Sequence, residues 1–145
     1  MRRMIDGKEY GVPICCPSRP DRFSPRSSTV FNHATIMAYK HVYDALGGYT
    51  VLPRTERGQD LDLWFRFLHA GYCGANMDDV LYIVCEDAQT LKRRTLRNRW
   101  RVFQTTMYGY RLLSYPWHWY FRPFFGLCKA LVPDRLVLWY RKRQR

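Results

Sequence analysis

The charge of this chain is divided sharply between two parts of its length. Residues 1–90 carry 10 Lys or Arg and 11 Asp or Glu, whereas residues 91–145 carry 14 Lys or Arg and a single acidic residue, Asp134. The first part is therefore close to neutral and the second has a net charge of +13. A surplus of this size is typical of a protein with an anionic partner, and here it belongs wholly to the C-terminal third.

The length and composition allow one folded domain with a real core. The 145 residues are 47% hydrophobic and 17% aromatic, which excludes a disordered tail. The longest stretch without Asp, Glu, Lys or Arg covers only 13 residues, 27–39, whereas a spanning helix needs roughly 17–25. The five cysteines show no zinc or redox spacing. These features predict a reduced, cytoplasmic protein that does not cross a membrane.

The pattern of the first 95 residues predicts an α/β fold. Residues 1–28 are rich in Pro and Gly and are expected to be irregular, with at most one short strand near residues 10–15. Beyond them the pattern predicts a strand over 29–39, a short helix over 40–46, a polar loop over 53–58, a helix over 60–70 and a buried strand over 80–85.

The C-terminal third predicts an amphipathic basic helix followed by a ring-rich tail. Apolar residues from Leu96 to Tyr110 step by four and three, and Pro116 ends the helix at the latest. Thirteen of the 24 aromatic residues lie in residues 91–145. Basic and aromatic residues together favour binding to an anionic membrane surface over binding to nucleic acid. A third interpretation is that the rings pack on the rest of the domain.

Two aspartates at the start of the predicted helix over 60–70 are the strongest candidates for chemistry. Asp60 and Asp62 point about 200° apart on a helix, so one can face a cleft while the other caps the helix or faces solvent. The helix dipole favours an ionised carboxylate in the first turn, and a general base must be ionised. The alternative is that both only cap the helix. A metal-binding Asp-x-Asp is rejected, because this motif opens a helix instead of ending a buried strand.

Four short motifs occur in an order that resembles the C-terminal half of a family 2 glycosyltransferase of the GT-A fold. The resemblance covers residues 28–95. The motifs are His33-x-Thr35-x-Met37, Gly47-Gly48-Tyr49, Asp60-x-Asp62-Leu63-Trp64-x-Arg66 and Asn76-x4-Leu81-Tyr82. The resemblance implies a partial GT-A domain whose acceptor side is formed by residues 29–95, followed by a basic aromatic tail over 96–145.

The resemblance also implies a reaction and a set of site residues. The expected reaction transfers a sugar from a nucleotide-sugar donor to a hydroxyl acceptor with inversion, in glycan or glycolipid biosynthesis. Asp60 is expected to be the general base. The residues expected to bind substrate are His33, Thr35, Gly47, Gly48 and Asp62. A structural role for the histidine and helix termination by the two glycines remain open beside this.

The partners implied by the resemblance include parts that this sequence does not supply. No nucleotide-binding strand, loop and helix precede residue 28, so a missing N-terminal half is expected to bind the donor. A divalent cation, Mg or Mn, is expected from the family, with ligands outside this chain. The acceptor is expected to be a glycan or a lipid-linked molecule at the inner face of the membrane. The alternative function is a non-catalytic basic module that binds an anionic membrane or nucleic acid.

Overall fold

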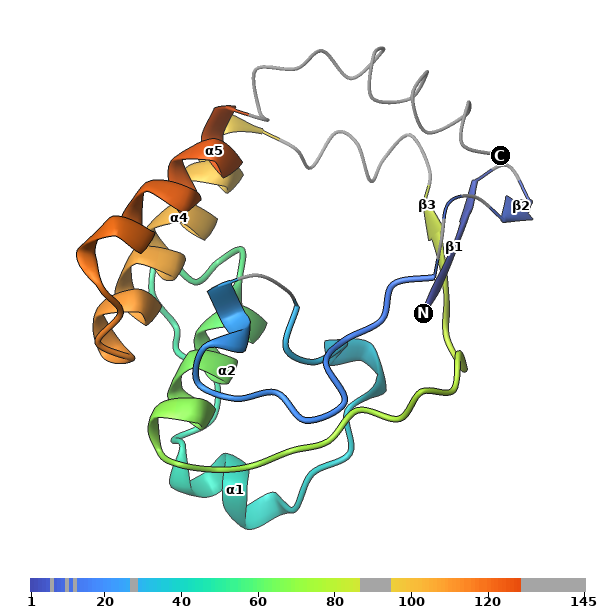
Figure 1. Cartoon of the computed structure of the whole chain (residues 1–145), viewed down its shortest axis with the longest axis horizontal. Coiled ribbons are helices and arrows are strands. Elements are labelled where there is room, and N and C mark those ends of the chain that lie inside the picture. The colour runs from blue at the N-terminus through green and yellow to red at the C-terminus, as the bar shows by residue number, and fades with distance from the viewer. Residues whose placement is uncertain (6, 10, 12, 27–28, 87–94, 129–145) are drawn as a thin grey trace.

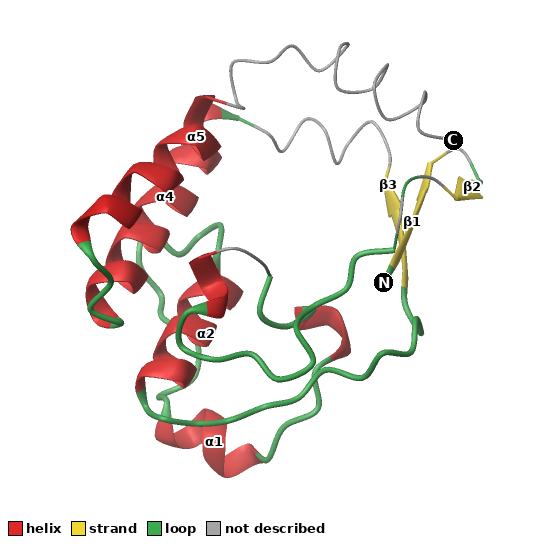
Figure 2. Cartoon of the chain, viewed as in Figure 1, coloured by secondary structure: helices red, strands yellow, loops and turns green. Residues whose placement is uncertain are grey.

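The computed structural model describes residues 1–5, 7–9, 11, 13–26, 29–86 and 95–128 (Figure 1). Three short strands and several helices confirm an α/β protein (Figure 2). The elements are, in chain order, β1 (Arg2–Ile5), β2 (Lys8–Glu9), the 3-10 helices η1 (Ser24–Arg26) and η2 (His33–Thr35), α1 (Lys40–Ala45), α2 (Gln59–His69), β3 (Ile83–Glu86), α4 (Leu96–Leu112), the 3-10 helix η3 (Trp117–Phe121) and α5 (Arg122–Cys128).

The sheet joins the start of the chain to a strand about 80 residues later. Its order is β2-β1-β3, with β1 antiparallel to β2 and parallel to β3. Arg2 lies opposite Ile83 in the parallel register. The predicted strand over 80–85 is thus present with its bounds shifted to 83–86. The prediction that it is buried is wrong, because Leu81 and Ile83 are 78% and 49% exposed.

Two other strand predictions are also wrong. Residues 29–39 contain η2 instead of a strand, because the backbone N–H and hydroxyl of Thr35 both donate to the Asn32 carbonyl and close a local turn. The apolar Val30 and Phe31 pack against α2 instead of entering a sheet. The short strand predicted near residues 10–15 is absent from the described residues there, and β1 and β2 form earlier. Residues 2–5 form a strand because they pair with β3, and the local sequence pattern gives no sign of that distant contact.

The helices α1, α2 and α4 lie close to where the sequence predicts them. α1 ends before Gly47 and Gly48, which have φ values of +70° and +67° that suit glycine at a helix end. α2 spans Gln59–His69 and follows Gly58, whose φ is +114°. α4 spans Leu96–Leu112, and its N-cap Thr95 side chain accepts a hydrogen bond from the Asn98 N–H.

α2 is the centre of the core because it buries two of its faces. One face, with Leu63, Trp64 and Phe67, packs against the loop that carries Val30 and Phe31. The other face packs against α4 and the turn after it. The buried residues of this second cluster are Phe65, Tyr110, Leu113 and Tyr115. The expectation that Trp64 belongs to the core is confirmed.

Asn76, in the last of the four motifs, holds two loops in place. Its side-chain amide donates to the carbonyl oxygens of Pro17 and Val30 at 2.6 and 2.8 Å. Its backbone N–H donates to the Ser18 carbonyl at 2.8 Å. This residue therefore fixes the N-terminal loop and the loop before η2 against residues 73–82.

α4 and α5 lie side by side on the edge of the molecule opposite the sheet (Figure 1). α2 packs against α4, so the order across this side is α2, α4 and α5. Within the described ranges, no helix combines the length and the apolar character needed to cross a membrane. Residues 129–145 of the predicted basic aromatic tail lie outside the described residues.

Because α2 and α4 are in close contact at Gly109, we expect any side chain at this position to destabilise the fold. A Cβ atom at this position would lie 2.1 Å from Cδ2 of the buried Phe65 ring. We expect Gly109→Ala to lower the free energy of unfolding by about 1–3 kcal/mol, the cost of overpacking a core. Urea unfolding followed by circular dichroism measures this.

Gly126→Ala in α5 is the matched control. A Cβ atom there meets no heavy atom within 4 Å, so the substitution is expected to be neutral or to stabilise by up to about 1 kcal/mol. Equal effects of the two substitutions would contradict the packing of α4 on Phe65.

Candidate functional site

Asp62 is fully buried at the centre of a network of charged and polar side chains. Its Oδ1 atom accepts a hydrogen bond from Arg54 at 2.6 Å. Its Oδ2 atom accepts hydrogen bonds from Thr50 at 2.7 Å and from Arg66 at 2.9 Å. A buried carboxylate is tolerated only when it is paired and hydrogen-bonded, and both oxygens meet that condition here.

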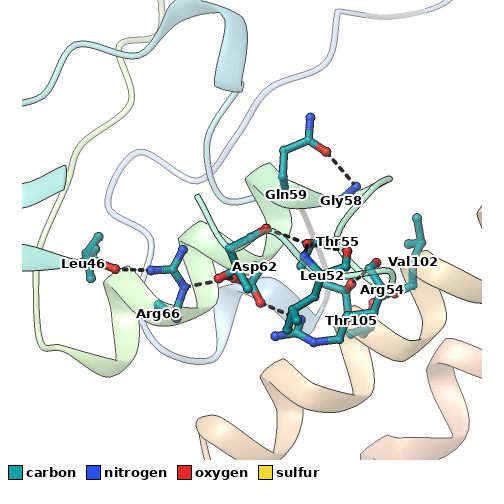
Figure 3. A network of polar contacts seen from close by, with 12 residues as sticks. Leu46, Leu52, Arg54, Thr55, Gly58, Gln59, Asp62, Arg66, Val102 and Thr105 are labelled. Atoms are coloured by element: carbon teal, nitrogen blue, oxygen red, sulfur yellow. Dashed lines mark hydrogen bonds and ion pairs between the residues drawn. The ribbon is translucent and has the colours of Figure 1, made fainter. Parts of the chain in front are cut away.

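The two arginines carry the network outward from Asp62 (Figure 3). Arg66 donates to the carbonyl oxygens of Leu46 and Gly48, the latter at 2.7 Å, and so fixes the turn after α1. The Arg54 guanidinium lies 4.0 Å from the centre of the Tyr108 ring on α4. One carboxylate thus links the turn after α1, the loop over 50–58, α2 and α4.

The electrostatics of Asp62 follow from this arrangement. Burial on its own raises the pKa of a carboxyl group. The hydrogen bonds from Thr50, Arg54 and Arg66, together with the charge of Arg54, outweigh burial, and the pKa of Asp62 is lowered. The ionised form is therefore part of the folded structure.

Asp60, two residues earlier, has the opposite environment. It lies in the first turn of α2 and is half-buried. Among the described residues no hydrogen bond or ion pair engages its carboxylate. The alternative that both aspartates cap the helix is wrong, because the N-cap is Gly58 and no side chain caps it.

A hydrogen-bonded pair of rings lies near Asp60. The Tyr49 hydroxyl is 2.7 Å from Nε2 of His33, and the two rings meet edge to face. Burial raises the pKa of Tyr49, and the nearby Tyr43 and Asp60 raise it further, so the hydroxyl keeps its proton at neutral pH.

An open pocket of about 750 Å³ adjoins the pair. His33, Tyr49 and Thr50 form one part of its lining, and the loop over 51–56 and Gln59 form the rest. Asp60 does not line the pocket, although both its chain neighbour Gln59 and the nearby Tyr49 do. Asp60 therefore adjoins the pocket lining through Gln59 without forming part of it.

The other predicted site residues are placed in different ways. Gly47 and Gly48 form the turn after α1, and the Gly48 carbonyl accepts from Arg66. Thr35 is exposed and lines a separate, more apolar pocket of about 430 Å³ between the N-terminal loop and residues 73–82. Asp62 has no surface open to a ligand. The structure therefore brings His33 and Asp60 near one pocket and leaves Thr35 and Asp62 outside it.

The described residues do not fit a bound divalent cation. They form no group of three or more His, Cys, Asp or Glu side chains that could hold a metal ion. Asp62, the second carboxylate of the Asp-x-Asp motif, is neutralised by Arg54 and Arg66. The divalent cation stays a prediction from the resemblance.

Comparison with known proteins gives one clear relative. The chain is 34% identical over 147 aligned positions to the Bacillus subtilis (strain 168) protein named "Putative glycosyltransferase EpsE", which covers 97% of this chain. The chain spans about half, 51%, of the length of EpsE. No family model and no solved structure matches the chain. The similarity supports a glycosyltransferase function in general.

Sequence reasoning missed three residues that build this site. Arg66 could have been found, because it lies four residues after Asp62 on the same helix face, a spacing that favours ion pairs. Tyr49 belongs to the Gly-Gly-Tyr motif, but nothing local indicates its contact with His33. Arg54 lies in a loop and gives no periodic signal, so only the fold reveals its contact with Asp62.

The two aspartates should differ strongly in their effect on stability. We expect Asp62→Asn to lower the free energy of unfolding by about 3 kcal/mol, because it leaves two largely buried arginines without their counter-charge. Asp60→Asn is the matched control and should change stability by less than about 0.5 kcal/mol. Urea unfolding of the two variants at pH 7 measures the difference, and similar losses in both would contradict the network.

The same carboxylate predicts a pH dependence. The pKa of Asp62 is lower in the folded chain than in the unfolded chain, so its stabilising contribution is complete above about pH 4. The contribution is lost as the pH falls through the lowered pKa of the folded state. The stability difference between the wild type and Asp62→Asn should therefore be constant near neutrality and shrink in acid. If the stability difference between the two proteins grew on acidification, the pKa of Asp62 would be raised by folding instead of lowered.

Proposed function

We propose that this chain forms the acceptor side of an inverting family 2 glycosyltransferase of the GT-A fold, with Asp60 as its general base. The similarity to EpsE along nearly the whole chain supports a glycosyltransferase. The single structural observation that carries the assignment is the half-buried Asp60 carboxylate, which has no hydrogen-bond or ion-pair partner among the described residues and directly follows Gln59 of the pocket lining.

The proposed chemistry needs only one proton acceptor from this chain. The acceptor hydroxyl oxygen attacks the anomeric carbon of the donor while its proton passes to the Asp60 carboxylate. The bond between that carbon and the nucleoside diphosphate breaks on the opposite face, and its electron pair leaves with the diphosphate. Attack from the face opposite the leaving group inverts the anomeric centre. A hydroxyl is a poor nucleophile until a positioned base accepts its proton, which is the role of Asp60.

The neighbouring network would keep this base in place. Asp62 is in the same first turn of α2, and its bonds to Arg54, Arg66 and Thr50 fix that turn on three sides. A rigid support keeps the Asp60 carboxylate aligned with the acceptor hydroxyl when the substrate binds. In this proposal His33 and Tyr49 form the wall of the acceptor site, and Asp62 supports the site without touching the substrate.

Donor binding is proposed to come from a further segment. The chain spans about half the length of EpsE. We propose a nucleotide-sugar donor, a glycan or lipid-linked acceptor, and a divalent cation held by residues outside those described. No step above passes through the cation. The reaction is proposed to take place on the cytoplasmic side of the membrane.

Asp60→Asn tests the proposal without disturbing the fold. The codon is changed in the gene as it stands in its genome, so that any segment that supplies the donor site is retained. We expect sugar transfer from labelled nucleotide sugars in cell extracts to fall at least about 100-fold, the usual contribution of a general base. Protein abundance should be unchanged, because the Asp60 carboxylate has no partner to lose.

Glu56→Gln is the control for catalysis. Glu56 lines the same pocket but its carboxylate pairs with Arg101. This variant should keep most of the transfer activity. Transfer by Asp60→Asn at near the wild-type rate would rule out Asp60 as the base.

A further inference from the structure

A row of aromatic rings projects outward from η3 and α5. Trp117, Phe121 and Phe125 are spaced four residues apart along these consecutive helical turns. Their exposed fractions are 75%, 59% and 69%. Phe124, beside this row, is 48% exposed. Rings of this size are normally buried, so a contiguous exposed row marks a binding surface. Trp117, Phe121 and Phe125 are named here the outer ring row.

The residues of the outer ring row do not take part in the packing of the core. The same segment has an inner face, formed by Trp119 and Tyr120, which packs against the cluster around Tyr110 and Tyr115. The contact of α5 with α4 is made through Phe124 and Phe103, whose ring centres are 4.8 Å apart. The core contacts are therefore complete without Trp117, Phe121 and Phe125.

The charge of the segment that carries the row has one sign. Residues 95–128 contain five arginines and no Asp or Glu. Three of these arginines, Arg97, Arg111 and Arg122, are exposed. Arg101 is paired with Glu56 and is not counted as part of this positive surface.

We propose that the outer ring row and the exposed arginines of α4 and α5 bind the surface of a membrane that contains anionic lipid. Tryptophan and phenylalanine rings enter the boundary between headgroups and acyl chains, while arginines bind lipid phosphates. The absence of carboxylates over residues 95–128 matches a negatively charged surface. This inference involves neither Asp60 nor the pocket beside it and does not depend on the proposed catalysis.

The geometry of the rings favours lipid over nucleic acid. Trp117 and Phe121 meet edge to face, with ring centres 6.0 Å apart and planes at 77°, so they present no common stacking platform for bases. Base stacking needs free ring faces, whereas insertion between lipids needs only apolar bulk. Fluid acyl chains adapt to rings that project by different amounts.

Vesicle co-sedimentation of the full chain tests the proposal. The probes are large vesicles of phosphatidylcholine alone and of phosphatidylcholine with one third phosphatidylglycerol. The variant Trp117→Ser, Phe121→Ser and Phe125→Ser removes the three outward rings, which have no core role. We expect it to weaken partitioning to the anionic vesicles at least about tenfold, and Arg111→Gln with Arg122→Gln to weaken it severalfold.

The matched control removes exposed apolar bulk elsewhere. Met37→Ser with Leu81→Ser changes side chains that are 97% and 78% exposed and lie outside the basic third of the chain. It should leave binding unchanged, and circular dichroism confirms that each variant is folded. Phe125→Ser alone provides a milder variant with a smaller expected loss.

Three results would overturn the proposal. The first is equal vesicle binding by the wild type and the triple variant. The second is binding of a single-stranded oligonucleotide that the triple variant loses while vesicle binding persists. The third is a wild-type dimer that becomes a monomer in the triple variant, which would show that the row contacts a second copy. Sedimentation velocity distinguishes the last case.

Discussion

The structure depends on one buried carboxylate that is shared by two arginines. Asp62 has no exposed surface, and its ionised form is stable only because Thr50, Arg54 and Arg66 replace the water that it has lost. Removing Asp62 would leave two largely buried arginines without their counter-charge. The network therefore specifies the relative positions of α1, α2, α4 and the intervening loop more strictly than apolar packing alone can.

This constraint also explains why two aspartates in one motif have different roles. The helical rotation between positions 60 and 62 directs one carboxylate into the network and leaves the other half-buried without a partner. The structural role of Asp62 makes the first turn of α2 rigid. In the proposed function, this support would hold the Asp60 carboxylate in place while its oxygens stay available to accept a proton.

The sequence predicts those parts of the molecule that local patterns determine. α2 and α4 follow from apolar periodicity, and the end of α1 follows from Gly47 and Gly48. The strand over 29–39 is predicted wrongly because β-branched and aromatic residues suit any half-buried extended segment, and here they pack on α2. Long-range contacts such as Arg54 with Asp62 arise only when the chain folds, so no local pattern indicates them, and the role of Asp60 stays a prediction.

The pairing of β1 with β3 has a consequence for how this chain folds during synthesis. β1 leaves the ribosome before its parallel partner, which is about 80 residues behind it. α1 and α2 can form from local contacts before that partner exists, whereas the sheet cannot be completed until β3 has emerged. Closing so large a loop is entropically costly and slow, so until then β1 is paired with β2 alone and its other edge stays open to incorrect pairing, the kind of edge that chaperones shield.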